Sequence, residues 1–233
     1  MQDQQEEEEE DDPCAICNES LPKLSSNLAI MTCCGKATHK KCHDNIYASS
    51  MSDEQKSRCI MCRTKHAAAG SKEEIDRLRR WVEKGKAWAQ SILGHWYREG
   101  VGVEQSHQQA RELYELAASQ GEAMAQNNLG TMYSNGHGVD QSDERAKEYY
   151  EAAAKQGHAG AQYNLGCLYG KGQGVEQSFE TAREWWMKAA EQGNASAIKG
   201  LQQFDEAEGK TTPSFTPPKR CSNCDTPKTP TNK

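Results

Sequence analysis

A segment of 36 residues is repeated along the chain, and this repetition limits the fold more than any other feature of the sequence. The three full copies occupy residues 87–122, 123–158 and 159–194. A fourth copy opens at Ala195 and ends near Phe204, and residues 77–85 match the second half of a copy. Repeats of this length stack on their neighbours into a solenoid. We therefore predict an all-α repeat domain over residues 71–205, with a half unit at each end.

Each unit predicts two helices joined by a loop that contains glycine. In the first copy, Ala89, Leu93 and Tyr97 recur every four residues, which places them on one apolar helix face. Gly100 and Gly102 follow this face. Because glycine adopts the left-handed conformations that terminate a helix, the first helix is expected to end at this pair.

The second predicted helix of each unit begins after a serine. Ser106 is placed as its N-cap, with Gln109 completing a capping box, and Ser142 and Ser178 repeat the cap in the later copies. The residues expected to be buried in the first copy are Ala110, Leu113, Tyr114, Ala117 and Ala118. Their small members would let neighbouring helices approach, while the large ones fill the remaining space.

The signatures "LGxxYxxGxGV" and "AxxxYxxAAxxG" resemble the Sel1-like repeat family, a relative of the tetratricopeptide repeats. The resemblance covers residues 77–201 and implies a right-handed αα superhelix that serves as a protein-binding scaffold. Cys167 stands where the earlier copies have His95 and Thr131, so we expect it to be an inert packing residue.

Amide side chains recur at two helical positions of the units. Gln126 and Gln162 share one position, which Gln90 occupies in the first copy, and Asn128 and Asn164 share the other. Amides can donate to and accept from an extended backbone, so these residues predict a peptide-binding site on the inner face. A solvated polar face without a ligand is the alternative.

The segment 13–66 holds eight candidate metal ligands in four pairs. They are Cys14, Cys17, Cys33, Cys34, His39, Cys42, Cys59 and Cys62. Two tetrahedral zinc ions need eight thiolate or imidazole donors, so both adjacent cysteines of the second pair are required. Zinc would also supply folding free energy that so short a segment lacks. Buried, unliganded cysteines are the alternative.

The ligand order resembles the RING finger, with "CAIC" and "CIMCR" matching that family's "CxIC" and "CPxCR". The resemblance implies a small cross-brace domain in which alternate pairs share an ion. One zinc would be held by Cys14, Cys17, His39 and Cys42. The other would be held by Cys33, Cys34, Cys59 and Cys62.

Two departures bear on this resemblance. Lys36 stands where the commonest RING has histidine, so the neighbouring cysteine completes the second site, as in RING variants with cysteine there; His43 is a substitute donor. The order of ligands alone also fits a PHD finger, but Ser57 stands where that family usually has tryptophan. RING is therefore the favoured interpretation.

RING resemblance implies an E3 ubiquitin ligase that recruits a ubiquitin-charged conjugating enzyme and has no catalytic nucleophile of its own. Ile16, Ile46 and Ile60 match the apolar contact surface for that enzyme; a place in the local core is the alternative for each, and it competes most strongly for Ile46. Arg63 matches the basic residue that bridges enzyme and ubiquitin, since its planar fork can donate to two partners. A non-catalytic zinc-binding adaptor is the alternative function.

The two ends of the chain predict disorder. Residues 1–12 carry eight acidic side chains; without them the 34 acidic residues fall to 26 against 28 basic ones, so charge gives no argument for nucleic acid. Residues 206–233 are rich in Pro, Thr and Lys, and their Cys221 and Cys224 resemble the first ligand pair of a truncated MYND finger. Two thiolates cannot complete a zinc site, so we expect this pair to be metal-free.

The expected cellular compartment is inferred from targeting signals that we do not find in the sequence. We see no signal segment and no apolar run long enough to cross a bilayer, which favours the cytoplasm or nucleus and excludes a membrane partner. In such a reducing compartment, ten cysteines argue for metal binding before disulfides.

Overall fold

The computed structural model describes residues 28–30, 37–39, 68, 70–207 and 209. The acidic tail 1–12, most of 206–233 with Cys221 and Cys224, and nearly all of the predicted zinc finger lie outside these residues. The predicted site residues outside them are Cys14, Ile16, Cys17, Cys33, Cys34, Cys42, Ile46, Cys59, Ile60, Cys62 and Arg63.

The chain divides into two compact parts, each of which is considered by itself. The described residues of the first part form a hairpin of β1 (Leu28–Ile30) and β2 (Ala37–His39). The strands pair antiparallel, with Leu28 opposite His39 and Ile30 opposite Ala37. His39 is thus the one predicted zinc ligand with a described backbone, and it lies at the open end of the hairpin.

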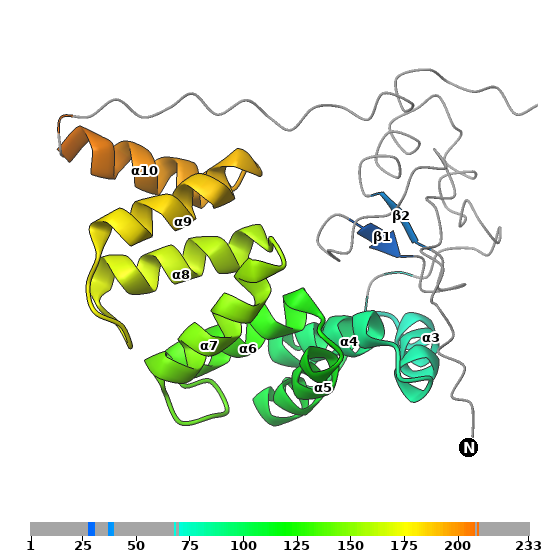
Figure 1. Ribbon diagram of the computed structural model, residues 1–233. Coiled ribbons are helices and arrows are strands. Elements are labelled where there is room, and N and C mark those ends of the chain that lie inside the picture. Colours follow the sequence, from blue (N-terminus) through cyan, green and yellow to red (C-terminus); the bar gives the residue numbers. More distant parts are fainter. Residues whose placement is uncertain (1–27, 31–36, 40–67, 69, 208, 210–233) are drawn as a thin grey trace, which may run out of the picture. The chain divides into compact units, whose positions relative to one another are not determined.

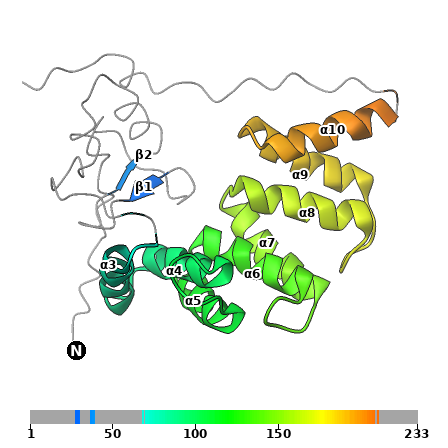
Figure 2. The ribbon, with the colours of Figure 1, turned by 180° about the vertical axis from the view of Figure 1, so that it is seen from behind.

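The second part is an array of helices in which each contacts the next along the chain (Figure 1). Its helices are α3 (Lys72–Glu83), α4 (Ala87–Glu99), α5 (His107–Ser119), α6 (Ala123–Asn135), α7 (Asp143–Lys155), α8 (Ala159–Lys171), α9 (Phe179–Glu191) and α10 (Ala195–Ala207). We call α4 with α5 the first unit, α6 with α7 the second and α8 with α9 the third. The single helices α3 and α10 lie at opposite ends of the array (Figures 1 and 2). The predicted all-α solenoid is confirmed.

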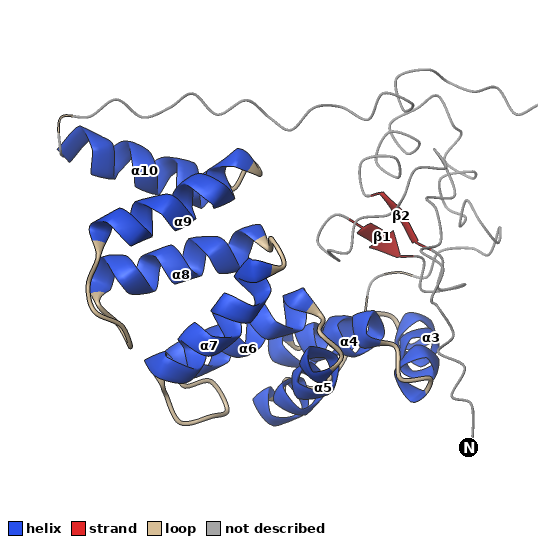
Figure 3. Ribbon diagram, viewed as in Figure 1, coloured by secondary structure: helices blue, strands red, loops and turns tan. Residues whose placement is uncertain are grey.

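The helices end where the sequence predicts (Figure 3). Gly100, Gly136 and Gly172 terminate the first helix of each unit in the left-handed conformation, with φ of 72°, 69° and 68°. Ser106, Ser142 and Ser178 cap the second helix, each hydroxyl accepting from the backbone N–H three residues on. These side chains satisfy helix-end donors that would otherwise lack a partner. In the described part of the chain, every helix is too short or too polar to cross a lipid bilayer.

The two helices of each unit pack through a glycine and an aromatic ring. A Cβ added at Gly130 in α6 would lie 2.6 Å from Cδ1 of Tyr150 in α7. Gly94 meets Tyr114 in the same way, at 2.9 Å from Cε1. Gly166 meets Trp186 in the third unit, at 2.6 Å from Cδ1. Any side chain at the glycine position would therefore force the helices apart.

Adjacent units stack through the second glycine of the connecting loop. Gly138 has φ of 72°, and a Cβ there would lie 2.7 Å from Cβ of His107 at the start of α5. Gly174 approaches the backbone of Asp143 at the start of α7 in the same manner. Gly102 approaches the backbone of Gly70, just before α3. The loop glycine Gly102 thus approaches the start of α3 as Gly138 and Gly174 approach the starts of the second helices α5 and α7. Helix α3 therefore takes the place of a second helix and serves as the half unit at the N-terminal end.

Burial differs in detail from the pattern expected for the first unit. Ala110, Tyr114 and Ala117 are fully buried, whereas Leu113 and Ala118 are half-buried. In α4, Trp96 is buried and Tyr97 is half-buried. The four-residue spacing identifies the buried stripe through Ala89 and Leu93, but it drifts off that stripe one turn later because a helix turns every 3.6 residues.

Helices α8 and α10 begin with chemically different caps. His158 caps α8 with Nδ1, which accepts from the N–H of Ala161 at 3.1 Å. Asn194 caps α10 with Oδ1, which accepts from the N–H of Ala197 at 3.0 Å. His158 is buried, and this burial lowers the pKa of its imidazole, although the Glu122 carboxylate acts in the opposite direction.

We predict that Gly130→Ala destabilises the chain by about 1–3 kcal/mol, because the added methyl would overpack against Tyr150. Gly200→Ala in α10 is the matched control, because a Cβ there meets nothing within 4 Å. It should be neutral or stabilise by up to about 1 kcal/mol through helix propensity. Urea unfolding followed by circular dichroism measures both free energies. Equal effects of the two substitutions would contradict the packing account.

We predict that the chain loses stability as the pH falls below the ordinary histidine pKa of 6.5, because of His158. The folded state holds the neutral imidazole, whose Nδ1 must accept a bond; the unfolded chain binds the proton more readily, so acid favours unfolding. Above pH 6.5 this contribution is fully present. His158→Asn, which copies the cap that Asn194 provides for α10, should reduce this pH dependence between neutral pH and the range where carboxylates titrate, leaving the part due to His95, whose pKa burial also lowers. Unfolding free energies of both proteins across that range provide the measurement, and an unchanged pH dependence would refute the assignment.

Candidate functional site

The recurring glutamines of the predicted peptide site form hydrogen bonds with other side chains of the same unit. Gln156 donates to Oε1 of Gln126 at 2.7 Å, and Gln192 donates to Oε1 of Gln162 at 2.8 Å. Gln162 is buried and also donates to the carbonyl of Ala154. In both glutamine pairs the end of a unit's second helix is tied to the start of its first, whereas the bond to Ala154 joins α8 to the preceding unit. The geometry gives these glutamines a structural role and leaves Gln126 only half-buried.

Asn128 also forms a hydrogen bond, with an arginine of the preceding unit. Arg98 in α4 donates through Nη1 to Oδ1 of Asn128 in α6 at 3.1 Å. The same guanidinium lies 3.1 Å from Nδ1 of His95 and donates to Glu99 at 2.7 Å. Arg98 therefore bridges the first helices of the first two units, and Asn128 is buried beneath it.

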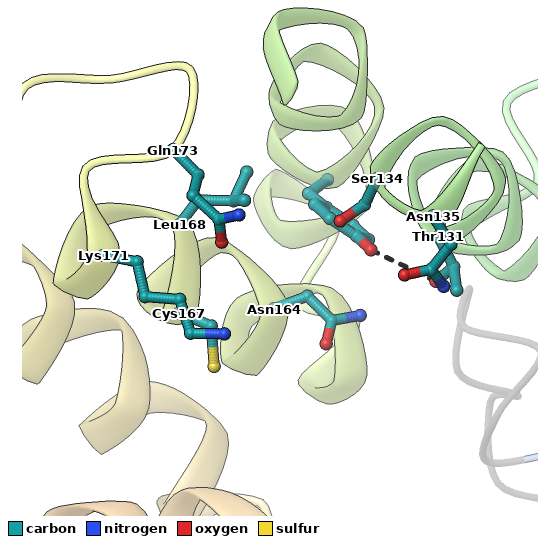
Figure 4. Close-up of a pocket in the computed structure, with 9 residues that line it drawn as sticks. Thr131, Ser134, Asn135, Asn164, Cys167, Leu168, Lys171 and Gln173 are labelled. Atoms are coloured by element: carbon teal, nitrogen blue, oxygen red, sulfur yellow. Dashed lines mark hydrogen bonds between the residues drawn. The ribbon is translucent and has the colours of Figure 1, made fainter. Parts of the chain in front are cut away.

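Asn164 is the predicted site residue that lines a pocket. This pocket of about 240 Å³ opens between α6 and α8 (Figure 4). Its lining residues are Thr131, Ser134, Asn135, Tyr150, Asn164, Cys167, Leu168, Lys171 and Gln173. Asn164 donates to Oδ1 of Asn127 at 3.1 Å, which fixes its amide at the boundary between the second and third units.

A chain of hydrogen bonds crosses the pocket wall. The Tyr150 hydroxyl donates to Oγ1 of Thr131 at 3.2 Å (dashed line in Figure 4). Thr131 in turn donates to the carbonyl of Asn127 at 3.1 Å. Burial raises the pKa of Tyr150, so its hydroxyl stays protonated at neutral pH and remains the donor. What the two hydroxyls offer a ligand is therefore acceptor capacity.

Cys167 lies half-buried on the pocket wall as a free thiol. Lys171, one helical turn further along α8, is exposed at the rim and contributes the positive charge of the site. Sequence reasoning did not single out Lys171 or Ser134. Aligning the copies at their 36-residue period would have done so, because that alignment places Ser134 and Lys171 opposite Arg98 and Glu99 of the first unit.

The pocket is suited to binding a polar group. No three His, Cys, Asp or Glu side chains come together as a candidate metal site within the described ranges. The predicted zinc ligands are not among the side chains that the structure describes. Amide, hydroxyl and ammonium groups converge on the pocket instead, and these recognise peptide backbone and negative charge.

The repeat segment is similar to known proteins. The Sel1 repeat family matches residues 89–122, 123–158 and 159–194. The crystal structure of a Sel1 repeat protein from Oxalobacter formigenes is 34% identical with a TM-score of 0.54, covering 57% of this chain and 54% of that one. A protective antigen of uropathogenic Escherichia coli strains that displays an SLR fold is 36% identical with a TM-score of 0.57, covering 64% of this chain and 31% of that one.

The chain thus spans only part of the length of both solved structures. None of the curated proteins matches the chain. The matched family, the two-helix units and the glycine-terminated first helices agree with one another over the same residues. Residues 89–194 are therefore three successive Sel1 repeats, and with their flanking helices they form an all-α solenoid.

Proposed function

We propose that the chain is a RING-type E3 ubiquitin ligase whose Sel1 repeats bind a second protein. The repeats form a scaffold for protein–protein interaction, and the segment 13–66 provides the RING. The observation that carries the ligase proposal is the run of eight zinc-type donors in four pairs, ending in "CIMCR". The repeats would select the substrate or assemble the ligase with it.

The β1–β2 hairpin supports the pairing of ligands in this proposal. Cys33 and Cys34 belong to the connection between the strands, whereas His39 closes β2 at the open end. An extended strand rises about 3.3 Å per residue, so β2 carries His39 about 7 Å beyond Ala37. In chain order the second ligand pair thus falls between the strands and His39 ends β2, an order compatible with separate ions for the second and third pairs.

The donor set fits zinc. Cys14, Cys17, His39 and Cys42 would hold one ion, and the remaining four cysteines the other, because thiolate and imidazole are the donors that structural zinc prefers. Zinc would supply folding free energy to this segment and leave ubiquitin transfer to the conjugating enzyme.

Ubiquitin transfer by such a ligase is a positioning effect. The conjugating enzyme holds ubiquitin as a thioester, and the ligase restricts it to a reactive orientation. Ile16, Ile46 and Ile60 would contact the conjugating enzyme through apolar surface. Arg63 would bridge enzyme and ubiquitin with its planar guanidinium.

A non-catalytic zinc-binding adaptor is the second candidate function. It is favoured by Ile60 and Ile46, which replace the proline and tryptophan common on the contact surface of active RING fingers. An adaptor would bind a partner through the same zinc-stabilised segment without promoting ubiquitin transfer. Arg63 favours the ligase over the adaptor.

We predict that the full chain, with a panel of charged conjugating enzymes, promotes its own ubiquitination. Arg63→Ala should reduce the rate by about tenfold or more, because the bidentate bridge would be lost. Arg58→Ala is the matched control. It removes the same charge from the residue before Cys59 and should leave the rate unchanged. Single-turnover discharge of ubiquitin provides the rate. Absence of transfer with every conjugating enzyme, while zinc remains bound, would support the adaptor instead.

A further inference from the structure

The pocket between α6 and α8 exists because an arginine is missing. In the first pair of units, Arg98 reaches across from α4 and donates to Asn128 of α6. The same positions 36 residues later are Ser134 and Asn164, and both line the pocket. Serine has no atom beyond its hydroxyl, so it does not fill the space that the arginine side chain occupies in the preceding pair.

Charge also differs between the two positions. Arg98 is paired with Glu99 at 2.7 Å, so the first interface carries both signs. At the second interface Asn135 replaces Glu99, and Lys171 lines the pocket. No acidic side chain of the described residues lines it with them. The pocket therefore presents a single positive charge to a ligand.

The remaining polar atoms suit a peptide. One amide hydrogen of Asn164 is used by Asn127, which leaves its second hydrogen and its oxygen for a ligand. Asn135 and Gln173 add two further amides to the wall. Tyr150 and Thr131 already donate their hydroxyl hydrogens inside the protein, and Ser134 is hydrogen-bonded to Tyr150, so the two hydroxyls retain only acceptor capacity. Such a mixture can pair with the N–H and C=O groups of an extended chain.

We propose that this pocket, which we call the Lys171 pocket, binds a peptide carboxylate of a partner protein. The ammonium of Lys171 donates a charge-assisted hydrogen bond to the carboxylate, and the surrounding amides hold the adjoining backbone. The proposal rests on that part of the proposed function in which the repeats bind a protein, and it is independent of ubiquitin transfer.

A carboxylate fits the pocket better than the cation that the first interface contains. A partner's guanidinium could occupy the volume that Arg98 fills in the first pair of units, but it would find no counterpart of Glu99, because Asn135 stands there. It would also lie beside Lys171, and like charges in one pocket repel. The ligand is therefore an anion of peptide origin, either an Asp or Glu side chain or a chain terminus.

The test uses short random peptides displayed on phage and selected on the immobilised full chain. One library carries a free C-terminus and the other is fused at both ends, so that terminal and side-chain carboxylates are distinguished. Enrichment of Asp or Glu in both libraries identifies the side chain, and enrichment confined to the free-ended library identifies the terminus. Either outcome supports the proposal, whereas selected peptides without a carboxylate preference overturn it.

Two substitutions then connect binding to the pocket. Lys171→Gln should raise the dissociation constant of a selected peptide by about fivefold, as measured by fluorescence anisotropy. Ser134→Leu should weaken binding strongly, because an uncharged side chain then fills the space that Arg98 occupies at the first interface. Lys199→Gln and Ser196→Leu, at exposed positions of α10, are the matched controls and should bind normally. Thermal unfolding confirms that each variant is folded.

Selected peptides that bind Ser134→Leu and Lys171→Gln as tightly as the unaltered chain would refute the Lys171 pocket. A chain that binds acidic peptides through Lys171 but transfers no ubiquitin would contradict the ligase function alone. Conversely, ubiquitin transfer without carboxylate binding would contradict the pocket alone. The two proposals therefore fail separately.

Discussion

The contact between a helical glycine and an aromatic ring sets the geometry on which the repeats depend. Because Gly94, Gly130 and Gly166 have no side chain, the ring of the second helix lies against the backbone of the first. The hydroxyl of a tyrosine ring in this position then differs between units in its hydrogen bonding. Tyr150 donates to Thr131 and so shapes the pocket wall, whereas the hydroxyl of Tyr114 is buried without a partner among the described residues. The spacing that builds the fold thus also determines the chemistry of the pocket wall.

Repetition makes small differences between units informative. A solenoid presents the same backbone positions again and again, so a residue that changes between copies alters one local surface and leaves the scaffold intact. Arg98 closes the space between the first two units by binding Asn128. Ser134 leaves the following space open, and Lys171 gives it a positive charge. The proposed binding site thus lies where a bridging side chain is absent, at a place that the neighbouring units hold fixed.

The sequence alone predicts the helices well, because caps, glycine stops and apolar spacing are local features that repeat. The serine caps and the all-α solenoid are confirmed on this basis. The peptide site could be predicted only in outline. Periodicity places Gln162 and Asn164 on recurring positions, yet it cannot tell that Gln192 engages the glutamine while a pocket opens beside the asparagine. Those outcomes depend on side chains from other helices. The zinc ligands stay a prediction, resting on donor type and spacing.

In our proposal the chain combines a metal-stabilised segment with repeats that need no metal. Hydrogen-exchange mass spectrometry on the full chain, before and after treatment with a zinc chelator, distinguishes the two parts. We expect two zinc ions to be released per chain, with faster exchange throughout residues 13–66 and unchanged protection in α4 to α9. Loss of protection in the repeats on chelation, or no zinc release and no change in residues 13–66, would contradict the account.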